Sequence, residues 1–434
     1  MALAEDRCKR IDGTPSLQSG ENMNRSEEGL LEGWLLYITN HFTHPVLEAQ
    51  GASPRHHLAR KLAEKGQKMI VFCPLGRHIG SPVRDFVSNI IPRRTVQGNT
   101  VYLFPPVIVS PASATTVITL VMATLFILTY LTLTRMRVVA QYSTTMLVGS
   151  VGAVIRMLMG VPFVANYGDP DFAREFGLAR KAFGFCEDLV MTRQNAHSVV
   201  YVDEVVGSYV RNNFPVKNTL FLPNGGYELG FVPPGSRSEG VLKRKKSLGL
   251  EGKLCVLYAG QITSVYRLDL LVSSAPGIIS HLPSVRFLII GDGPLLADLR
   301  KSVREARLED YFIFTGSIPY DDLSPYIVLS DLCVQLLNDW CMGTKVVMYM
   351  VHRKPVLASG NWYERYRLFL RNNENAFLIP SNPEVLADKI VEILEKPELL
   401  ERVGESAWRT VMPYTWDRHV EETLRLLREA ACSR

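Results

Sequence analysis

The sequence predicts an α/β protein made of two doubly wound domains in tandem, and three observations lead to this prediction. The chain has 434 residues, which is too long for one ordinary core and suits two domains of roughly 150 to 200 residues each. Short apolar strands alternate with helical stretches along most of its length. A Pro- and Gly-rich break at 223–253, which contains the basic run 243–246, separates two such series.

The first series follows a polar tail, 1–32, that we expect to be disordered, and it forms an N-terminal domain at 33–222. It opens with a strand at 34–39, a helix at 55–66 that ends at a glycine, and a strand at 69–73. Further strands are predicted at 101–103, 138–141, 163–166, 189–191, 199–202 and 219–222. This alternation indicates a parallel sheet that is covered on both faces.

The second series forms a C-terminal domain at 254–412, and the linker 223–253 supplies its first helix. Its strands are predicted at 254–258, 286–290, 311–314, 332–336, 355–358 and 376–379. A last helix, at 413–434, is expected to pack back on the N-terminal domain. Two Rossmann-like domains of this kind are expected to face a cleft at the carboxyl ends of their strands.

One long segment of the first domain is unusually apolar. No charged side chain occurs in 95–134, and a helix over 112–134 would span about 34 Å, enough to cross a bilayer. A single crossing would however separate the strands at 101–103 and 138–141, which belong to one predicted sheet. We therefore expect one side of this helix to cover the sheet and the other to meet lipid or a protein partner. Full burial in a domain or dimer core is the alternative. Basic residues that favour an anionic lipid surface flank the helix: Arg93, Arg94, Arg135 and Arg137.

Composition excludes several classes of function. The net charge of +5 is too small to indicate the concentrated basic face that nucleic-acid binding needs, so nucleic-acid binding is not expected. The seven cysteines are scattered, with no Cys-x-x-Cys pair and no histidines at metal spacing, which favours buried thiols in a reducing compartment and no metal site. No secretory signal is recognised at the start, so a cytoplasmic location is expected.

Short motifs recur in a fixed order along both predicted domains. They lie at 36–42, 51–55, 224–231, 257–260, 289–294, 314–319, 349–350 and 354–356. In order and spacing they resemble the family 4 retaining glycosyltransferases, which have the GT-B fold, over nearly everything from Trp34 to Trp416. The resemblance implies transfer of a hexose, with retention, from a nucleotide-diphosphate sugar to a hydroxyl or phosphate acceptor. It implies no metal and no other cofactor.

Glycines at predicted strand ends are the first candidates for donor binding. A strand that ends in glycine lets backbone N–H groups approach a pyrophosphate, and a helix that begins there presents its positive end to the anion. Gly51, Gly260, Gly291 and Gly293 are placed for this role, although each alone could be an ordinary tight turn. The resemblance adds Ile318 to the donor-binding residues.

The donor site departs from the pattern that the resemblance implies. Gln261 and Tyr266 stand where the family has the arginine and lysine that clamp the diphosphate, and Trp340 and Met348 replace two glutamates that hold sugar and ribose. Each lost charge-assisted contact is worth about 1.5 to 3 kcal/mol. The predicted substitutes are Lys345, Arg267, Thr263 and backbone amides.

Three interpretations of these departures remain open. The chain is an active enzyme with an altered donor site, a catalytically inactive subunit that partners an active enzyme, or a protein whose true alignment is shifted by a few residues. A sugar-nucleotide epimerase of the same architecture fits less well, because no matching set of histidine and carboxylate is found.

The predicted catalytic residues are Asp169 and Asp171, in a loop that follows a buried strand. A carboxylate there could orient or deprotonate an acceptor hydroxyl, or simply cap the next helix. His41 and His44 are weaker candidates on the first loop. The apolar helix favours a lipid-linked or membrane-proximal acceptor and a peripheral position on the inner face of the membrane.

Overall fold

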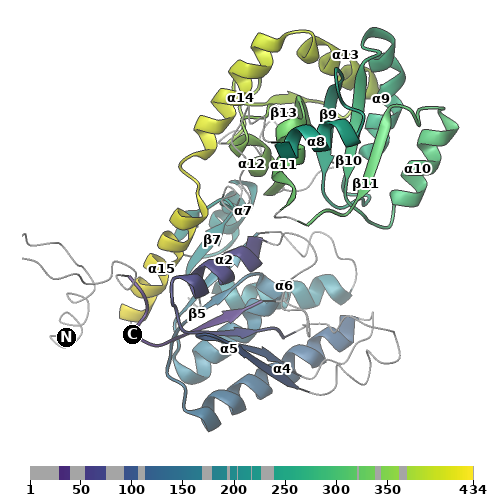
Figure 1. The fold of residues 1–434 in the computed structure, drawn as a ribbon. Coiled ribbons are helices and arrows are strands. Elements are labelled where there is room, and N and C mark those ends of the chain that lie inside the picture. The colour runs from purple at the N-terminus through teal and green to yellow at the C-terminus, as the bar shows by residue number, and fades with distance from the viewer. Residues whose placement is uncertain are drawn as a thin grey trace, which may run out of the picture. The chain divides into compact units, whose positions relative to one another are not determined.

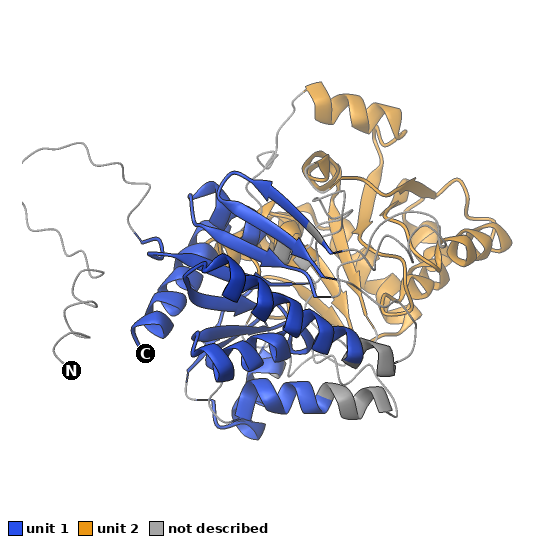
Figure 2. Cartoon of the chain, turned by 90° about the horizontal axis from the view of Figure 1, so that it is seen from below, with its two compact units in different colours: residues 1–223, 416–434 blue, residues 224–415 orange. Residues whose placement is uncertain are grey.

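The chain divides into two compact units, which the computed structural model defines over most of their length. Unit 1 comprises Met1–Pro223 and Trp416–Arg434, and unit 2 comprises Asn224–Thr415 (Figure 2). The last helix thus belongs to the first unit. The residues that the structure describes are 29–39, 54–74, 92–105, 113–168, 178–192, 196–202, 204–216, 218–225, 239–319, 322–337, 344–360 and 369–433.

Unit 1 is built on one sheet in the order β3-β4-β2-β1-β5-β6-β7-β8. Its strands are β1 (Trp34–Ile38), β2 (Met69–Phe72), β3 (Arg93–Gln97), β4 (Thr100–Phe104), β5 (Val138–Ser143), β6 (Phe163–Tyr167), β7 (Ala196–Tyr201) and β8 (Thr219–Phe221). All neighbours pair in parallel except β3, which lies antiparallel to β4 at the edge. β2 and β5 flank β1 on opposite sides, so successive strands are added to one side of β1 and then to the other. This reversal of strand order is typical of a doubly wound sheet.

Helices cover both faces of this sheet (Figure 1). On one face, α2 (Pro54–Glu64) and α15 (Trp416–Cys432) share a core with Leu35 and Tyr37 of β1. On the other, α4 (Ser113–Thr134) and α5 (Met146–Met159) share a core with Leu36 and Ile38. The remaining helices, α6 (Leu178–Met191) and α7 (Glu204–Asn213), join α5 in a further cluster. Alternate residues of β1 therefore point to opposite faces.

The apolar segment forms α4, and the strands before and after it belong to the same sheet, as predicted. Leu120, Ala123, Ile127 and Leu131 are buried against the sheet. Burial of each of the three larger side chains stabilises the fold by about 1.5 to 3 kcal/mol. The opposite side of α4 is exposed. Among the described residues, none of the helices has the combination of length and apolar character that a bilayer crossing requires.

Unit 2 is built on a six-stranded sheet, all parallel, in the order β11-β10-β9-β12-β13-β14. Its strands are β9 (Leu254–Ala259), β10 (Val285–Ile290), β11 (Phe312–Gly316), β12 (Leu332–Leu336), β13 (Val356–Ser359) and β14 (Phe377–Ile379). Five of the strands read as largely buried runs, as expected for a sheet with helices on both faces, whereas β11 at the edge is mostly half-buried. The alternation predicted from the sequence is confirmed for this sheet.

The helices of unit 2 surround that sheet (Figure 1). They are α8 (Glu239–Ser247), α9 (Leu268–His281), α10 (Leu296–Glu305), α11 (Ser324–Leu329), α12 (Thr344–Val351), α13 (Pro383–Leu394) and α14 (Pro397–Val411). Local sequence fixes some of their ends: the side chain of Asn382 accepts hydrogen bonds from the N–H groups of Glu384 and Val385, and Pro383 occupies the first turn.

One sequence expectation for unit 1 is wrong, and one of its strands was missed. The run 189–191, read as a strand, is the last turn of α6; its apolar residues form the buried side of a helix. Strand β3 was not predicted, because an exposed edge strand such as Arg93–Gln97 lacks an apolar signal.

Candidate donor site in unit 2

The candidate site is built on the carboxyl ends of the central strands of unit 2. Gly260 follows β9 directly and Gly291 follows β10, and these two strands are neighbours in register, with Ala259 opposite Ile290. In a doubly wound sheet, ligands bind at this edge. The predicted donor-binding glycines of this unit are therefore brought together.

The two glycine loops pack against each other very closely. A Cβ atom on Gly291 would lie 1.8 Å from the carbonyl oxygen of Gly260, and one on Gly293 would lie 2.3 Å from that of Ile262. Both glycines also have positive φ angles, 139° and 158°. Any other residue at either position would collide with backbone, so loop packing by itself requires glycine here.

The backbone N–H groups of these glycines already have acceptors within the protein. That of Gly260 donates to the carbonyl of Ile290 at 2.9 Å, and that of Gly291 donates to the carbonyl of Gly316 at 2.9 Å. The N–H of Gly293 donates to Oδ1 of Asp292 at 2.7 Å. The expected role of these three amides in holding a pyrophosphate therefore stays a prediction, and it would require these bonds to be exchanged.

A lysine supplies positive charge at this edge. Lys345 lies on the first turn of α12 and is only 8% exposed. Its Nζ donates to the hydroxyl of Tyr258 at 3.1 Å and lies 3.6 Å from the ring centroid of Tyr266. A Cβ atom on Gly260 would come within 2.4 Å of the same Nζ, so the absence of a side chain at Gly260 makes room for the ammonium group.

Two tyrosines hold this ammonium group in place. The rings of Tyr258 and Tyr266 meet edge to face, with centroids 5.8 Å apart, and Nζ of Lys345 lies 4.2 Å from the centroid of Tyr258. Aromatic faces attract a cation electrostatically. The hydroxyl of Tyr258 donates in turn to the carbonyl of Gln261 at 2.5 Å. Burial raises the pKa of Tyr258, so its hydroxyl stays a neutral donor.

Tyr266 thus takes part in the site in a different way from the lysine that the family resemblance implies at this position. Its backbone forms an isolated antiparallel bridge with Leu337, just after β12. Its ring contacts a lysine that comes from α12 instead. Lys345 therefore reaches Gly260, which follows β9, from helix α12 of the same unit.

Arg267, the second predicted substitute cation, is engaged in an ion pair. Its Nε lies 2.9 Å from Oδ1 and its Nη2 lies 2.7 Å from Oδ2 of Asp269, on the first turn of α9. The hydrogen bond to this carboxylate raises the pKa of the guanidinium. A role in donor binding would require Arg267 to leave Asp269.

The other predicted donor-binding residues of unit 2 differ in exposure. Gln261 is exposed and Ile318 is half-buried, whereas Met348 is buried on α12. The carbonyl of Met348 accepts a hydrogen bond from Nδ1 of His352 at 2.8 Å. Sequence reasoning did not assign a role to Tyr258 or Asp292, although Tyr258 lies two positions before Gly260 and Asp292 lies between Gly291 and Gly293.

In unit 1 the base of the predicted catalytic loop is a buried polar cluster. β6 ends at Tyr167, whose hydroxyl donates to Oε1 of Glu187, and the hydroxyl of Tyr209 donates to Oε2 of the same carboxylate at 3.0 Å. This cluster was not predicted. Asp169 and Asp171, like Gly51, His41, His44 and Trp340, lie outside the residues that the structure describes. The described residues contain no group of three or more His, Cys, Asp or Glu that could hold a metal ion.

Comparisons with known proteins agree with this architecture. Residues 242–410 match the family model described as Glycosyl transferases group 1. Alpha-D-kanosaminyltransferase of Streptomyces kanamyceticus is 26% identical over 165 residues, 38% of this chain and 42% of that protein. Alpha-monoglucosyldiacylglycerol synthase of Streptococcus pneumoniae is 23% identical over 143 residues, 33% of this chain and 32% of that protein. The chain thus matches less than half the length of these relatives.

Solved structures match over nearly the whole chain. Sucrose-phosphate synthase of Thermosynechococcus elongatus superimposes with a TM-score of 0.74 at 18% identity, over 93% of this chain and all of that one. HepE of Anabaena in complex with UDP-glucose gives a TM-score of 0.67 at 14% identity, over 92% of this chain and all of that one. The chain therefore has the GT-B fold, and its residues 242–410 form a domain that matches the group 1 glycosyl transferases.

Proposed function

We propose that the protein is a glycosyltransferase that moves a hexose from a nucleotide-diphosphate sugar to an acceptor, with retention of configuration. The observation that carries the proposal is the buried ammonium group of Lys345 beside Gly260, inside the domain that matches the group 1 family. A fixed positive charge of this kind stabilises the negative charge that develops on a leaving diphosphate. HepE, which shares the fold, is known in complex with UDP-glucose.

The proposed donor site has one buried cation where the family resemblance implies two cations, an arginine and a lysine. Gln261 and Tyr266 are uncharged, and Lys345 brings its charge to the same strand end from α12. Partial burial strengthens the attraction between Lys345 and a phosphate, because less water screens it. Even so, this site has one charge-assisted contact to phosphate fewer than a site with both cations. We therefore expect its affinity for the donor to be lower by roughly tenfold to a hundredfold.

Met348 changes how the donor is held. A thioether inside α12 accepts hydrogen bonds poorly, so it cannot replace a glutamate that binds hydroxyl groups. We propose that the diphosphate, held by Lys345, is the main anchor of the donor, with Gln261 and Ile318 at the exposed side of the same strand ends. Selectivity among sugars and nucleotides is then expected to be low.

The proposed chemistry uses few side chains. In a retaining transfer the leaving diphosphate stays close to the incoming nucleophile, so the protein mainly orients two substrates and stabilises charge. Asp169 and Asp171 remain the proposed residues for orienting or deprotonating the acceptor hydroxyl. No metal or cofactor is needed in this scheme.

The acceptor is proposed to be a lipid-linked glycan or a glycolipid, used by a protein that lies on the inner face of the membrane. Two observations support this proposal. One relative carries the name alpha-monoglucosyldiacylglycerol synthase, a protein that makes a glycolipid. The outer side of α4 exposes large apolar side chains that a fully water-facing helix would not carry.

The proposal is tested by incubating the purified protein with a panel of labelled nucleotide sugars, with and without lipid-linked acceptors. Saturable binding of at least one donor, slow hydrolysis of it, or transfer of the sugar is expected. A folded protein that binds none of the panel would contradict the proposal and favour an inactive subunit that partners an active enzyme. The two results are separated further by testing whether the protein copurifies with an active transferase.

A further inference from the structure

The outer side of α4 exposes several large apolar side chains. Ile118, Val121, Met122 and Leu125 are each about half exposed, and their spacing of three and four residues places them on one side of the helix. Leu133, at the other end of the same helix, is 78% exposed. The buried residues of α4 face the sheet and already supply its core contacts. The exposed apolar side chains therefore make no contribution to that core.

The end of α5 extends this surface. Met157, Leu158 and Met159 occupy its last turn, and Leu158 is 68% exposed. α5 packs beside α4, and both helices lead into parallel strands of the same sheet, so both end at the same edge of it. We name the exposed apolar residues of α4 and of the last turn of α5 the apolar patch.

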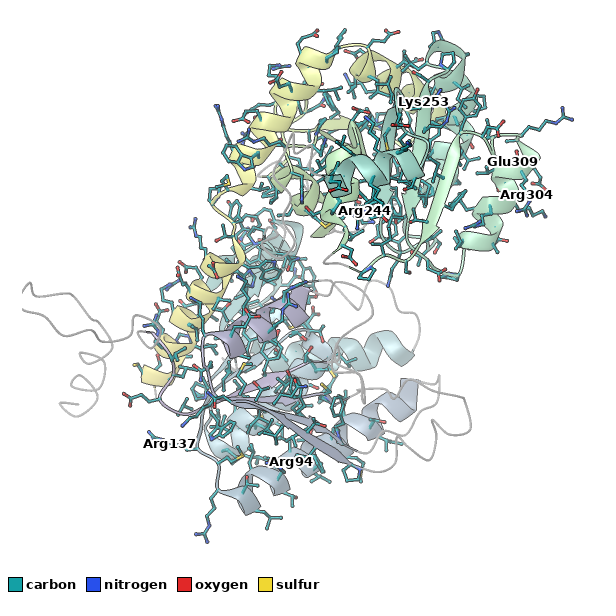
Figure 3. All side chains as sticks on the ribbon, in the orientation of Figure 1. Arg94, Arg137, Arg244, Lys253, Arg304 and Glu309 are labelled. Carbon is teal, nitrogen blue, oxygen red and sulfur yellow. The ribbon has the colours of Figure 1, made fainter. Side chains whose placement is uncertain are left out.

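The stretch of chain that forms the apolar patch carries charge of one sign. From Phe86 to Gly168 the sequence contains no Asp, Glu or Lys, and its only charged side chains are arginines. Arg135 and Arg137 follow α4 and are exposed, and Arg156 lies on the last turn of α5. Nε of Arg94 donates to the hydroxyl of Tyr130 on α4 at 3.2 Å. Figure 3 labels Arg94 and Arg137 in this unit. An apolar surface whose own two helices carry no carboxylate, and whose flanking charged residues in the same stretch of chain are arginines, is complementary to an anionic bilayer surface.

We propose that the apolar patch is a docking surface for a bilayer that contains anionic lipids, with α4 lying in the plane of the interface. The apolar side chains enter the region between headgroups and acyl chains, and the arginines contact lipid phosphates. A second copy of this chain fits the surface less well, because it would bring arginines of the same sign together without any carboxylate from α4 or α5 to pair them. The inference rests on the proposed function only for its purpose, which is to bring the protein to a lipid-linked acceptor.

The test is flotation of the full-length protein with vesicles of phosphatidylcholine alone or of phosphatidylcholine with phosphatidylglycerol. Binding is expected to be strong only with the anionic lipid and to weaken as salt is raised. Leu125→Asp and Leu158→Asp are each expected to lower the bound-to-free ratio about tenfold or more. Arg137→Gln is expected to lower it about fivefold.

The matched control is Leu242→Asp, because Leu242 on α8 of unit 2 is 51% exposed and Leu125 is 56% exposed. Leu242→Asp should leave vesicle binding unchanged. Equal binding to both kinds of vesicle, no binding to either, or a loss that is the same for Leu242→Asp and Leu125→Asp would overturn the inference. So would a concentration-dependent dimer that Leu125→Asp dissociates, since a second copy would then cover the patch.

Donor binding measured without vesicles separates this inference from the proposed function. If vesicle binding fails while a nucleotide sugar still binds, only the docking surface is wrong. If the protein binds anionic vesicles but no donor, the docking surface stands and the enzymatic proposal does not.

Discussion

The two sheets of the molecule are covered on the same plan, but the helices over them present different surfaces to their surroundings. The outer helices of unit 2 pair acids with bases, as in Lys301–Glu305, Lys389–Glu392 and Arg409–Glu405. Figure 3 labels both Arg304 and Glu309 on the outside of this unit. In unit 1, α4 and α5 contain no carboxylate at all. The difference shows that a shared architecture does not impose a shared surface.

A second difference lies in how the two units place polar groups. Unit 2 brings a lysine, two tyrosines and two glycine loops to the carboxyl ends of its strands. In unit 1 the cluster at the end of β6 is a buried carboxylate that accepts from two tyrosines. The proposed function assigns the anionic donor to unit 2 and the acceptor to unit 1.

The largest expected effect comes from the contact between the glycine loops of unit 2. Gly291→Ala should destabilise unit 2 by about 4 kcal/mol or more, because its Cβ would overlap the carbonyl oxygen of Gly260. Gly316→Ala is the control: its φ is 73°, but no atom lies within 4 Å of the added carbon. It should cost only about 1 kcal/mol. Urea unfolding, with hydrogen exchange of β9 and β10, measures both. Equal effects would show that backbone strain matters and loop packing does not.

The next largest effect is the pH dependence of stability, which we attribute to one buried histidine in each unit. Nδ1 of His352 in unit 2 donates to the carbonyl of Met348, and its Nε2 accepts from the hydroxyl of Ser324 at 2.5 Å. Nδ1 of His419 in unit 1 donates to the carbonyl of Pro223 at 3.2 Å. Burial lowers the pKa of each from 6.5 to about 4, so both are neutral in the folded protein at neutral pH.

Stability should therefore fall as the pH is lowered. Below pH 6.5 the unfolded chain binds protons that the folded protein does not, until the pH reaches about 4. Each histidine is expected to reduce the free energy of unfolding by up to about 3 kcal/mol across this range. Unfolding curves at several pH values measure the slope, and His419→Gln should reduce it for unit 1 alone. An unchanged slope in this variant would exclude His419 as a source.

Much of the fold was predictable from sequence because its signals are local. The apolar runs of β1, β2, β9, β10 and β12 were placed to within one or two residues. The strand expected at 189–191 failed because three apolar residues cannot distinguish a short strand from a helical turn. β3 was missed because an exposed strand at a sheet edge needs no apolar residues and so gives no apolar signal in the sequence.

The candidate site was predictable only in part. Lys345 was identified as a substitute cation, but its partners, Tyr258 and Tyr266, lie about 80 residues earlier in the chain and are brought to it by the fold. The donor-binding role of the glycines stays a prediction, and the close contacts of Gly291 and Gly293 come from the pairing of β9 with β10, which single-sequence patterns do not give. The pairing of Arg267 with Asp269 was also not foreseen, although the two residues are only two positions apart.

The most direct measurement of the whole account is donor affinity in variants of Lys345. Lys345→Met keeps an unbranched side chain of similar length against the tyrosines but removes the charge, and Lys345→Arg keeps the charge. Calorimetry with the nucleotide sugar that binds best should show a loss of roughly tenfold to a hundredfold for Lys345→Met. Lys301→Ala, which removes an exposed lysine of the same unit, should change nothing. Wild-type affinity in a folded Lys345→Met protein would contradict the account.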